Sequence, residues 1–302
     1  MKRLIQSLLF VIAVVVVLVH LLGGWNYSNV LIADAFEVDE VESFAVPEGQ
    51  GIEVVEFSTP LGEMDAWYLP ATGTTWVIHV HGRGGSPDEA LPLFGPLREA
   101  GYPQLAITYR NDPGQPPDPS GYYQYGFTEW RDIESAMDYA VANGADQIVL
   151  SGFATGAAHV ISLVYHVSLD RIAGLVLDSP NLDFSTTVDF TLAQRELPLV
   201  PIQVPRTVSE VAKFFTSMRI GVNWKSLDYV DNAERSFSHP VLIHHGTDDA
   251  TIPIAPSREF AETRPDLVRL IEVEGAGHVG SYDVDPDSYV AAVLDFLASV
   301  GR

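Results

Sequence analysis

Residues 147–158 read Gln-Ile-Val-Leu-Ser-Gly-Phe-Ala-Thr-Gly-Ala-Ala, and this stretch decides which fold we expect. It begins with a largely apolar run, which is typical of a strand buried on both faces of a sheet. Small residues gather at Gly152, Gly156 and Ala157, around the start of a helical pattern over residues 155–166. Because small residues let a strand and a helix pack closely, the stretch predicts a buried strand that turns directly into a helix.

Strand and helix patterns alternate on both sides of this turn. Two short alternating strands come first and are joined by a turn at residues 59–62, so we expect them to pair antiparallel. The later strands are separated by helical stretches long enough for parallel crossovers. The sequence therefore predicts an α/β fold with an eight-stranded, mostly parallel sheet covered by helices on both faces. The expected strands cover residues 51–58, 63–69, 75–80, 104–109, 147–150, 172–177, 241–244 and 268–273.

A long insertion, residues 181–238, separates the sixth and seventh expected strands. It contains two helical patterns, over residues 186–195 and 208–220. A long connection with its own secondary structure is usually functional. We therefore expect a helical cap over the site of the protein.

The N-terminus contains an apolar stretch from Leu4 to Leu22, 19 residues without a formal charge. About 20 apolar residues suffice for a helix to cross a bilayer. Lys2 and Arg3 precede the stretch, which places the N-terminus in the cytoplasm by the positive-inside rule. We expect a single-pass transmembrane anchor over residues 1–33, an acidic tether over 34–50, and the main domain, 51–302, on the extracytoplasmic side.

A cleaved signal peptide is the alternative reading of this N-terminus. Ala33-Asp34-Ala35 matches the small-residue pattern of a cleavage site. That site lies more than ten residues beyond Leu22, and the apolar run exceeds the usual length of about 7 to 15 residues for a signal peptide. Both features favour the retained anchor.

Composition excludes several classes of function. The chain has no cysteine, which rules out a thiol nucleophile, a thiolate metal site and a disulfide framework. Its net charge of −23 repels nucleic acid and anionic headgroups, so we expect no nucleic-acid partner.

Four short motifs follow expected strands in order along the chain. Each combines small residues with a side chain or backbone group that could carry chemistry. They are His81-Gly-Arg-Gly-Gly85, Gly152-Phe-Ala-Thr-Gly156, His245-Gly-Thr-Asp-Asp-Ala-Thr-Ile-Pro253 and Glu274-Gly-Ala-Gly-His278.

With these motifs in this order, residues 50–302 resemble the α/β-hydrolase superfamily, including its serine aminopeptidase and prolyl-oligopeptidase-like members. The second motif matches the Gly-x-Ser-x-Gly nucleophile elbow, with Ala154 where the serine would stand. The resemblance implies that Asp249 is the acid and His278 the general base of a Ser-His-Asp triad. It selects Asp249 over Asp248, and His278 is the one histidine that follows Asp249.

The resemblance also implies an oxyanion hole built from backbone N–H groups. Arg83 is the expected first donor, with Gly84 as the second choice, and Thr155 supplies the other N–H. No metal or organic cofactor is implied. His79 and His81 lack the further ligands of a metal site, so we interpret them as a core and a loop histidine.

Aromatic residues suggest where a substrate could bind. Tyr122 and Tyr123 lie in a loop expected at the carboxyl edge of the sheet, and Phe214 lies in the expected cap. These side chains could line a pocket. They could equally anchor the loop against the cap or form the core of the cap itself.

Ala154 decides between two hypotheses. Alanine cannot attack a carbonyl, and losing a triad serine costs on the order of a millionfold in kcat. The first hypothesis is a hydrolase of carboxylic esters or amides, with peptides also possible, whose serine has been replaced. The second is a natural pseudoenzyme that binds an acyl or peptide ligand, or a protein partner, without turnover. The presence of Asp249 and His278 favours the first.

Overall fold

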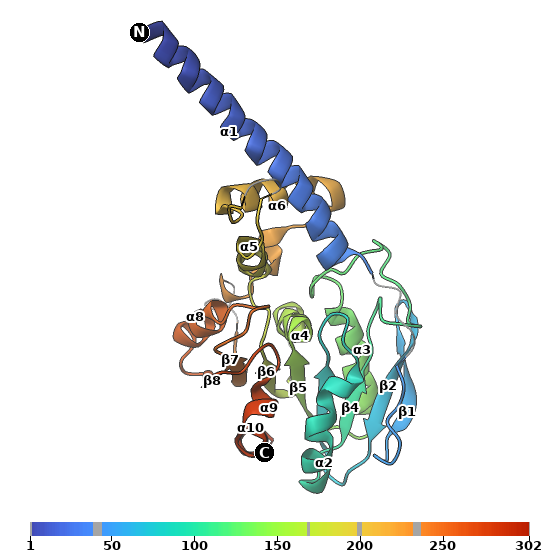
Figure 1. The fold of residues 1–302 in the computed structure, drawn as a ribbon. Coiled ribbons are helices and arrows are strands. Elements are labelled where there is room, and N and C mark those ends of the chain that lie inside the picture. Colours follow the sequence, from blue (N-terminus) through green and yellow to red (C-terminus); the bar gives the residue numbers. More distant parts are fainter. Residues whose placement is uncertain (1, 39–43, 168–169, 198–200, 232–236, 302) are drawn as a thin grey trace.

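The structure is a computed structural model that describes residues 2–38, 44–167, 170–197, 201–231 and 237–301. Its centre is an eight-stranded sheet in the order β1-β2-β4-β3-β5-β6-β7-β8 (Figure 1). β2 pairs antiparallel with β1 and β4, and every other pairing is parallel. This confirms the predicted sheet. The strands are β1 (Glu53–Thr59), β2 (Gly62–Leu69), β3 (Thr75–Val80), β4 (Gln104–Ile107), β5 (Gln147–Phe153), β6 (Ile172–Asp178), β7 (Val241–Gly246) and β8 (Val268–Val273).

Helices cover both faces of the sheet, as predicted. On one face, α3 (Trp130–Ala142), α4 (Thr155–His166) and α8 (Ala255–Thr263) share a core with alternate strand residues such as Ile78. On the other face, η2 (Pro87–Ala90), α2 (Leu91–Glu99) and α10 (Pro286–Val300) pack against the intervening residues such as Val77. Consecutive residues of β3 thus enter opposite cores, which explains why its sequence is continuously apolar.

Strand ends differ from the sequence prediction by a few residues. β5 continues through Phe153 and β7 through Gly246. β4 stops at Ile107 rather than Tyr109, because the Tyr109 N–H donates to the Asp112 carboxylate instead of to a neighbouring strand. The longer β5 carries the strand right up to Ala154.

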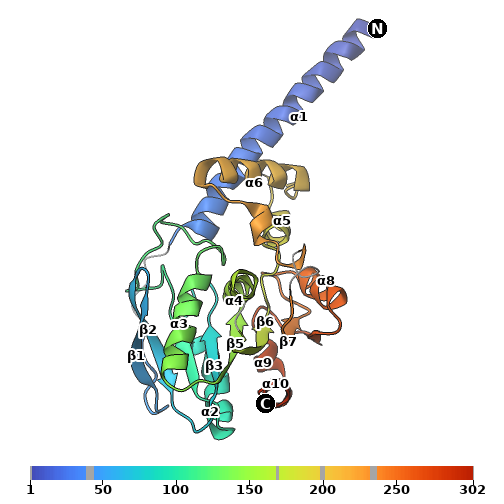
Figure 2. The same ribbon diagram turned by 180° about the vertical axis from the view of Figure 1, so that it is seen from behind.

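The cap contains the two predicted helices, α5 (Phe184–Ala193) and α6 (Arg206–Ile220), followed by the short helix η3 (Trp224–Leu227). The Asp183 side chain accepts a hydrogen bond from the Thr186 N–H and so caps α5. Gly221 ends α6 in the left-handed conformation, with φ of 77°. Both ribbon views show α5 and α6 at one end of the sheet, with the last part of the N-terminal helix alongside α6 (Figures 1 and 2).

The N-terminal helix α1 (Lys2–Leu31) is long and apolar enough to span a membrane. Its first two thirds project from the rest of the molecule (Figure 1), and its apolar side chains there are exposed. Its last third packs on α6. A Cβ added at Gly24 would lie 2.3 Å from Val211 Cγ1, so a glycine is needed for this close approach.

The π-helix η1 (Ile32–Phe36) continues α1 toward the sheet domain. Phe36 is buried and its carbonyl accepts a hydrogen bond from the Tyr123 N–H. Phe36, near the start of the expected tether, is therefore packed against the main domain. Residues 39–43 of that tether lie outside the described residues.

Candidate active site

The site begins at the turn between β5 and α4. Ala154 occupies this turn with φ of 48° and ψ of −113°, a conformation that costs a non-glycine residue about 1–3 kcal/mol. Two backbone hydrogen bonds hold it there, from Ala154 N to the Asp178 carbonyl at 2.9 Å and from Asn181 N to the Ala154 carbonyl at 3.1 Å. Such strain persists only where the surroundings impose it, and it directs the residue 154 side chain away from the strand.

The two glycines of the motif make the tight turn possible. A Cβ at Gly152 would lie 2.5 Å from Ala157 Cα, and one at Gly156 would lie 2.2 Å from the Val80 carbonyl oxygen. Both distances are far below a van der Waals contact. The small residues at these positions therefore serve the close packing of α4 on β5 and β3.

Asp249 and His278 come together from the loops after β7 and β8. His278 Nδ1 lies 2.8 Å from Asp249 Oδ2, while Asp249 Oδ1 accepts hydrogen bonds from the N–H groups of Thr251 and Ile252. Burial by itself would raise the pKa of Asp249, but its interactions with His245, His278 and the Ile252 N–H outweigh burial and hold the pKa below its usual value.

The ionised Asp249 determines the state of the His278 ring. A carboxylate can only accept a hydrogen bond, so Nδ1 of His278 must carry a proton and donate it. The neutral ring then has its lone pair at Nε2. This is the arrangement that a general base requires.

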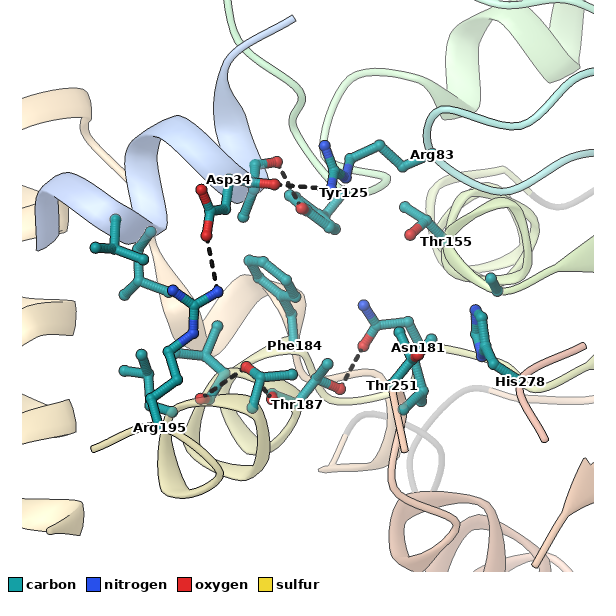
Figure 3. Close-up of a pocket in the computed structure, with 18 residues that line it drawn as sticks. Asp34, Arg83, Tyr125, Thr155, Asn181, Phe184, Thr187, Arg195, Thr251 and His278 are labelled. Atoms are coloured by element: carbon teal, nitrogen blue, oxygen red, sulfur yellow. Dashed lines mark hydrogen bonds and ion pairs between the residues drawn. The ribbon is translucent and has the colours of Figure 1, made fainter. Parts of the chain in front are cut away.

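A cavity of about 240 Å³ joins these residues. Ala154, Thr155, His278 and Arg83 all line it, together with Tyr125 and residues of α5 and the end of α1 (Figure 3). Asp249 does not line the cavity but forms a hydrogen bond with His278, which does. The structure thus brings most of the expected catalytic and oxyanion residues to one cavity.

Four other expected site residues do not line this cavity. Gly84 lies beyond Arg83 in the same loop, in a left-handed conformation with φ of 68°. Tyr122 pairs with Glu37, and Tyr123 lies 5.6 Å from the Arg83 guanidinium. Phe214 is 59% exposed on α6. The α6 residues Val208 and Ala212 face the protein instead, which follows from the period of the helix.

The loop after β3 passes directly over the turn. A Cβ at Gly82 would lie 3.1 Å from Ala154 Cβ, and the Gly82 N–H is taken by the Glu89 carboxylate at 2.8 Å. The Gly82 N–H is therefore occupied, and Arg83 and Gly84 stay the expected donors of this loop. Thr155 is the first residue of α4, so its N–H has no acceptor within the helix and lies at the positive end of the helix dipole.

A buried pair fixes this loop from below. His81 Nε2 lies 2.9 Å from Asp112 Oδ2, and the Tyr109 hydroxyl donates to the carbonyls of His81 and Gly82. Burial alone would lower the pKa of His81, but the Asp112 carboxylate outweighs burial and raises it. His79 is a buried core residue whose pKa burial lowers to about 4. Among the described residues, no group of three or more His, Asp or Glu side chains could hold a metal ion.

Sequence reasoning missed several residues of the cavity. Asn181 follows β6 at the same edge of the sheet and could have been found from that position. Three other residues could not have been found from the sequence, because their position in the cavity depends on how distant helices dock. These are Asp34 and Ala35, at the end of the N-terminal helix, and Arg195, after α5.

No family model matches the chain. The uncharacterized protein YfhR of Escherichia coli strain K12 is 22% identical over 265 residues, covering 84% of this chain and 83% of YfhR.

Solved structures also resemble the chain. The Pyrococcus furiosus esterase Pf2001 superposes with a TM-score of 0.68 and 20% identity, covering 88% of this chain and 98% of the esterase. An esterase from Thermogutta terrifontis superposes with a TM-score of 0.58 and 18% identity, covering 83% of this chain and 100% of that esterase. The chain therefore has the α/β-hydrolase fold.

Proposed function

We propose that this chain is a membrane-anchored hydrolase of carboxylic esters, or of amides, that works by Ser-His-Asp acyl transfer when residue 154 is a serine. With Ala154 the chain lacks a nucleophile and is catalytically inactive. The observation that carries the proposal is the Asp249–His278 hydrogen bond of 2.8 Å, in which His278 lines the same cavity as the strained turn at Ala154. An abandoned site has no chemical reason to keep a base and the residue that orients it.

The chemistry follows from these positions. The hydroxyl of a serine at position 154 attacks the substrate carbonyl, and His278 Nε2 takes its proton. Asp249 stabilises the imidazolium, while the N–H groups of Thr155 and Arg83 hold the oxyanion. The leaving group departs with the proton from His278. Water then repeats the sequence on the acyl-enzyme, with His278 again acting as base.

Two lines of support favour small esters as substrates and a membrane location. The similar structures include two proteins described as esterases. Lys2 and Arg3 precede the apolar part of α1, which supports an extracytoplasmic position of the main domain by the positive-inside rule. A peptide is the alternative substrate, because the similar structures also include an acylaminoacyl peptidase from Pyrococcus horikoshii.

Ala154 itself favours a second candidate, a non-catalytic protein that binds an acyl or peptide ligand or a protein partner. The two candidates differ in what one hydroxyl would do. A pseudoenzyme that has also lost other groups needed for catalysis would gain no hydrolytic activity from a serine at position 154.

The test is the Ala154→Ser variant, assayed with 4-nitrophenyl acetate, butyrate and octanoate. We expect turnover that the parent chain lacks. Adding His278→Ala should abolish it, whereas adding His166→Ala, an exposed histidine outside the cavity, should leave it unchanged. A folded Ala154→Ser variant without turnover of any ester would contradict the hydrolase proposal.

A further inference from the structure

The wall of the cavity opposite the catalytic residues comes from the N-terminal helix. Val30 and Leu31 at the end of α1, with Asp34 and Ala35 of η1, line the same cavity as His278. Figure 3 shows His278 on one side, Asp34 and Arg195 on the other, and Phe184 between them. The apolar lining residues at the α1 side are Val30, Leu31, Phe184, Val188 and Leu192.

Three separate elements hold this wall in place. From the loop after β3, Arg83 Nη2 donates to the Asp34 carbonyl at 2.7 Å. Beyond α5, Arg195 Nη2 lies 2.8 Å from Asp34 Oδ2. The Tyr125 hydroxyl donates to the Ala35 carbonyl at 2.6 Å. The Arg195 pair is about half-exposed and contributes little by itself, so the fixation comes from the three contacts together.

The helix that precedes the wall is docked as firmly. Thr216 of α6 donates to Ser28 Oγ at 3.1 Å, and the Tyr27 hydroxyl donates to the Glu196 carbonyl. Arg219 bonds both Ser28 and Asn29. One continuous helix therefore runs from the exposed apolar stretch to the cavity.

This continuity fixes the height of the cavity above a membrane. Val30 lies eight residues beyond Leu22, the end of the apolar stretch, which is about 12 Å along a helix. The headgroup region adds roughly 5–8 Å to each side of the hydrocarbon core. With α1 spanning the bilayer, the cavity lies just above the headgroups.

From these contacts we propose that α1 is an integral wall of the substrate pocket, and that the pocket takes a single-chain carboxylic ester from the membrane surface. The acyl chain lies against α1 and α5, and the ester carbonyl lies at residue 154. A cavity of about 240 Å³ is small beside the roughly 300–1,000 Å³ of drug-sized ligand sites, which favours one short chain over two. The identity of the bound group as a substrate rests on the proposed function.

The pocket is complete only in a chain that retains the N-terminal helix. Cleavage after Ala35 would remove Val30, Leu31, Asp34 and Ala35, and with them this side of the pocket. A chain that keeps its pocket must keep its helix.

The test uses the parent chain with Ala154, embedded in phosphatidylcholine nanodiscs. Because the chain has no cysteine, a single introduced cysteine reports on its own position. Val30→Cys and Thr191→Cys place the reporter on the α1 and α5 sides of the cavity, and Val54→Cys, on the exposed face of β1, is the control. The rate of alkylation by N-ethylmaleimide is measured with and without ethyl octanoate, an alkyl ester that does not acylate a thiol under these conditions and that a chain with Ala154 cannot turn over.

We expect the ester to slow alkylation several-fold at both cavity positions and to leave the control unchanged. Protection at Thr191→Cys but not at Val30→Cys would overturn the role of α1. Equal rates with and without ester at both positions, or equal slowing at all three, would overturn the pocket. The readout is binding alone, so protection without turnover by the Ala154→Ser variant would refute the hydrolase proposal while leaving the pocket intact.

Discussion

The two ends of the cavity are built in opposite ways. The end that holds the proposed catalytic residues uses loops that follow β5, β7 and β8 of one sheet, and these loops bring Ala154, Asp249 and His278 together. The far end depends on a helix from the start of the chain that docks on an inserted cap. The difference indicates that the proposed catalytic residues are positioned by the sheet, while the shape of the pocket depends on the N-terminal helix and the inserted cap.

The largest effect should come from the catalytic end. In the Ala154→Ser background, Asp249→Asn should lower kcat by about 10⁴-fold, because an amide cannot hold the imidazole in the required tautomer. The adjacent exposed residue provides a matched control, and Asp248→Asn should leave kcat unchanged. Steady-state ester hydrolysis measures both. A larger loss of kcat for Asp248→Asn than for Asp249→Asn would show that Asp249 is not the acid.

At the far end, the expected effect is on selectivity rather than on chemistry. In the same background, Val30→Trp should fill the apolar side and lower kcat/KM for the octanoate ester by about 10-fold or more, a loss of about 1.4 kcal/mol. The acetate ester should be spared. Val19→Trp, on the exposed part of α1, is the control and should change neither. Equal losses for both esters would mean that the far end affects the chemistry as well.

The tight turn can be tested through stability. Gly156→Ala forces a Cβ against the Val80 carbonyl, and overpacking of this kind costs about 1–3 kcal/mol in the free energy of unfolding. Gly95→Ala, in α2 with open space around its Cβ, should be neutral or slightly stabilising. Denaturant titration in detergent compares the two. Similar destabilisation by both variants would show that close packing at the turn is unimportant.

The smallest effect should be a pH dependence at Asp249. Its pKa is lower in the folded than in the unfolded chain, so it stabilises the fold above its unfolded pKa of about 3.9 and loses this contribution as the pH falls further. The stability advantage of the parent over Asp249→Asn should therefore shrink between about pH 5 and pH 2. Thermal melts across this range measure it. An advantage that grows with acidity would contradict the lowered pKa.

The sequence predicts the sheet and its helices because those patterns are local and periodic. The apolar run of β3 and the two helical repeats of the cap needed no knowledge of distant residues. The turn at Ala154 is equally local, since Gly152 and Gly156 signal close packing.

The far end of the cavity carries no such signal. Asp34 and Ala35 lie in what the sequence indicates as a polar tether, and only the docking of α1 on α6 brings them to the cavity. Phe214 was expected near substrate because it is aromatic, but the rotation of α6 turns it outward. Composition cannot reveal which face of a helix a distant partner covers.

The most direct test of the central claim is covalent labelling of residue 154. The folded Ala154→Ser variant is incubated with a fluorophosphonate, and the intact mass and the modified peptide are determined. The account predicts one label per chain at residue 154, absent in the parent and in the variant that also carries His278→Ala. A folded Ala154→Ser variant that stays unlabelled, or that is labelled elsewhere, would contradict it.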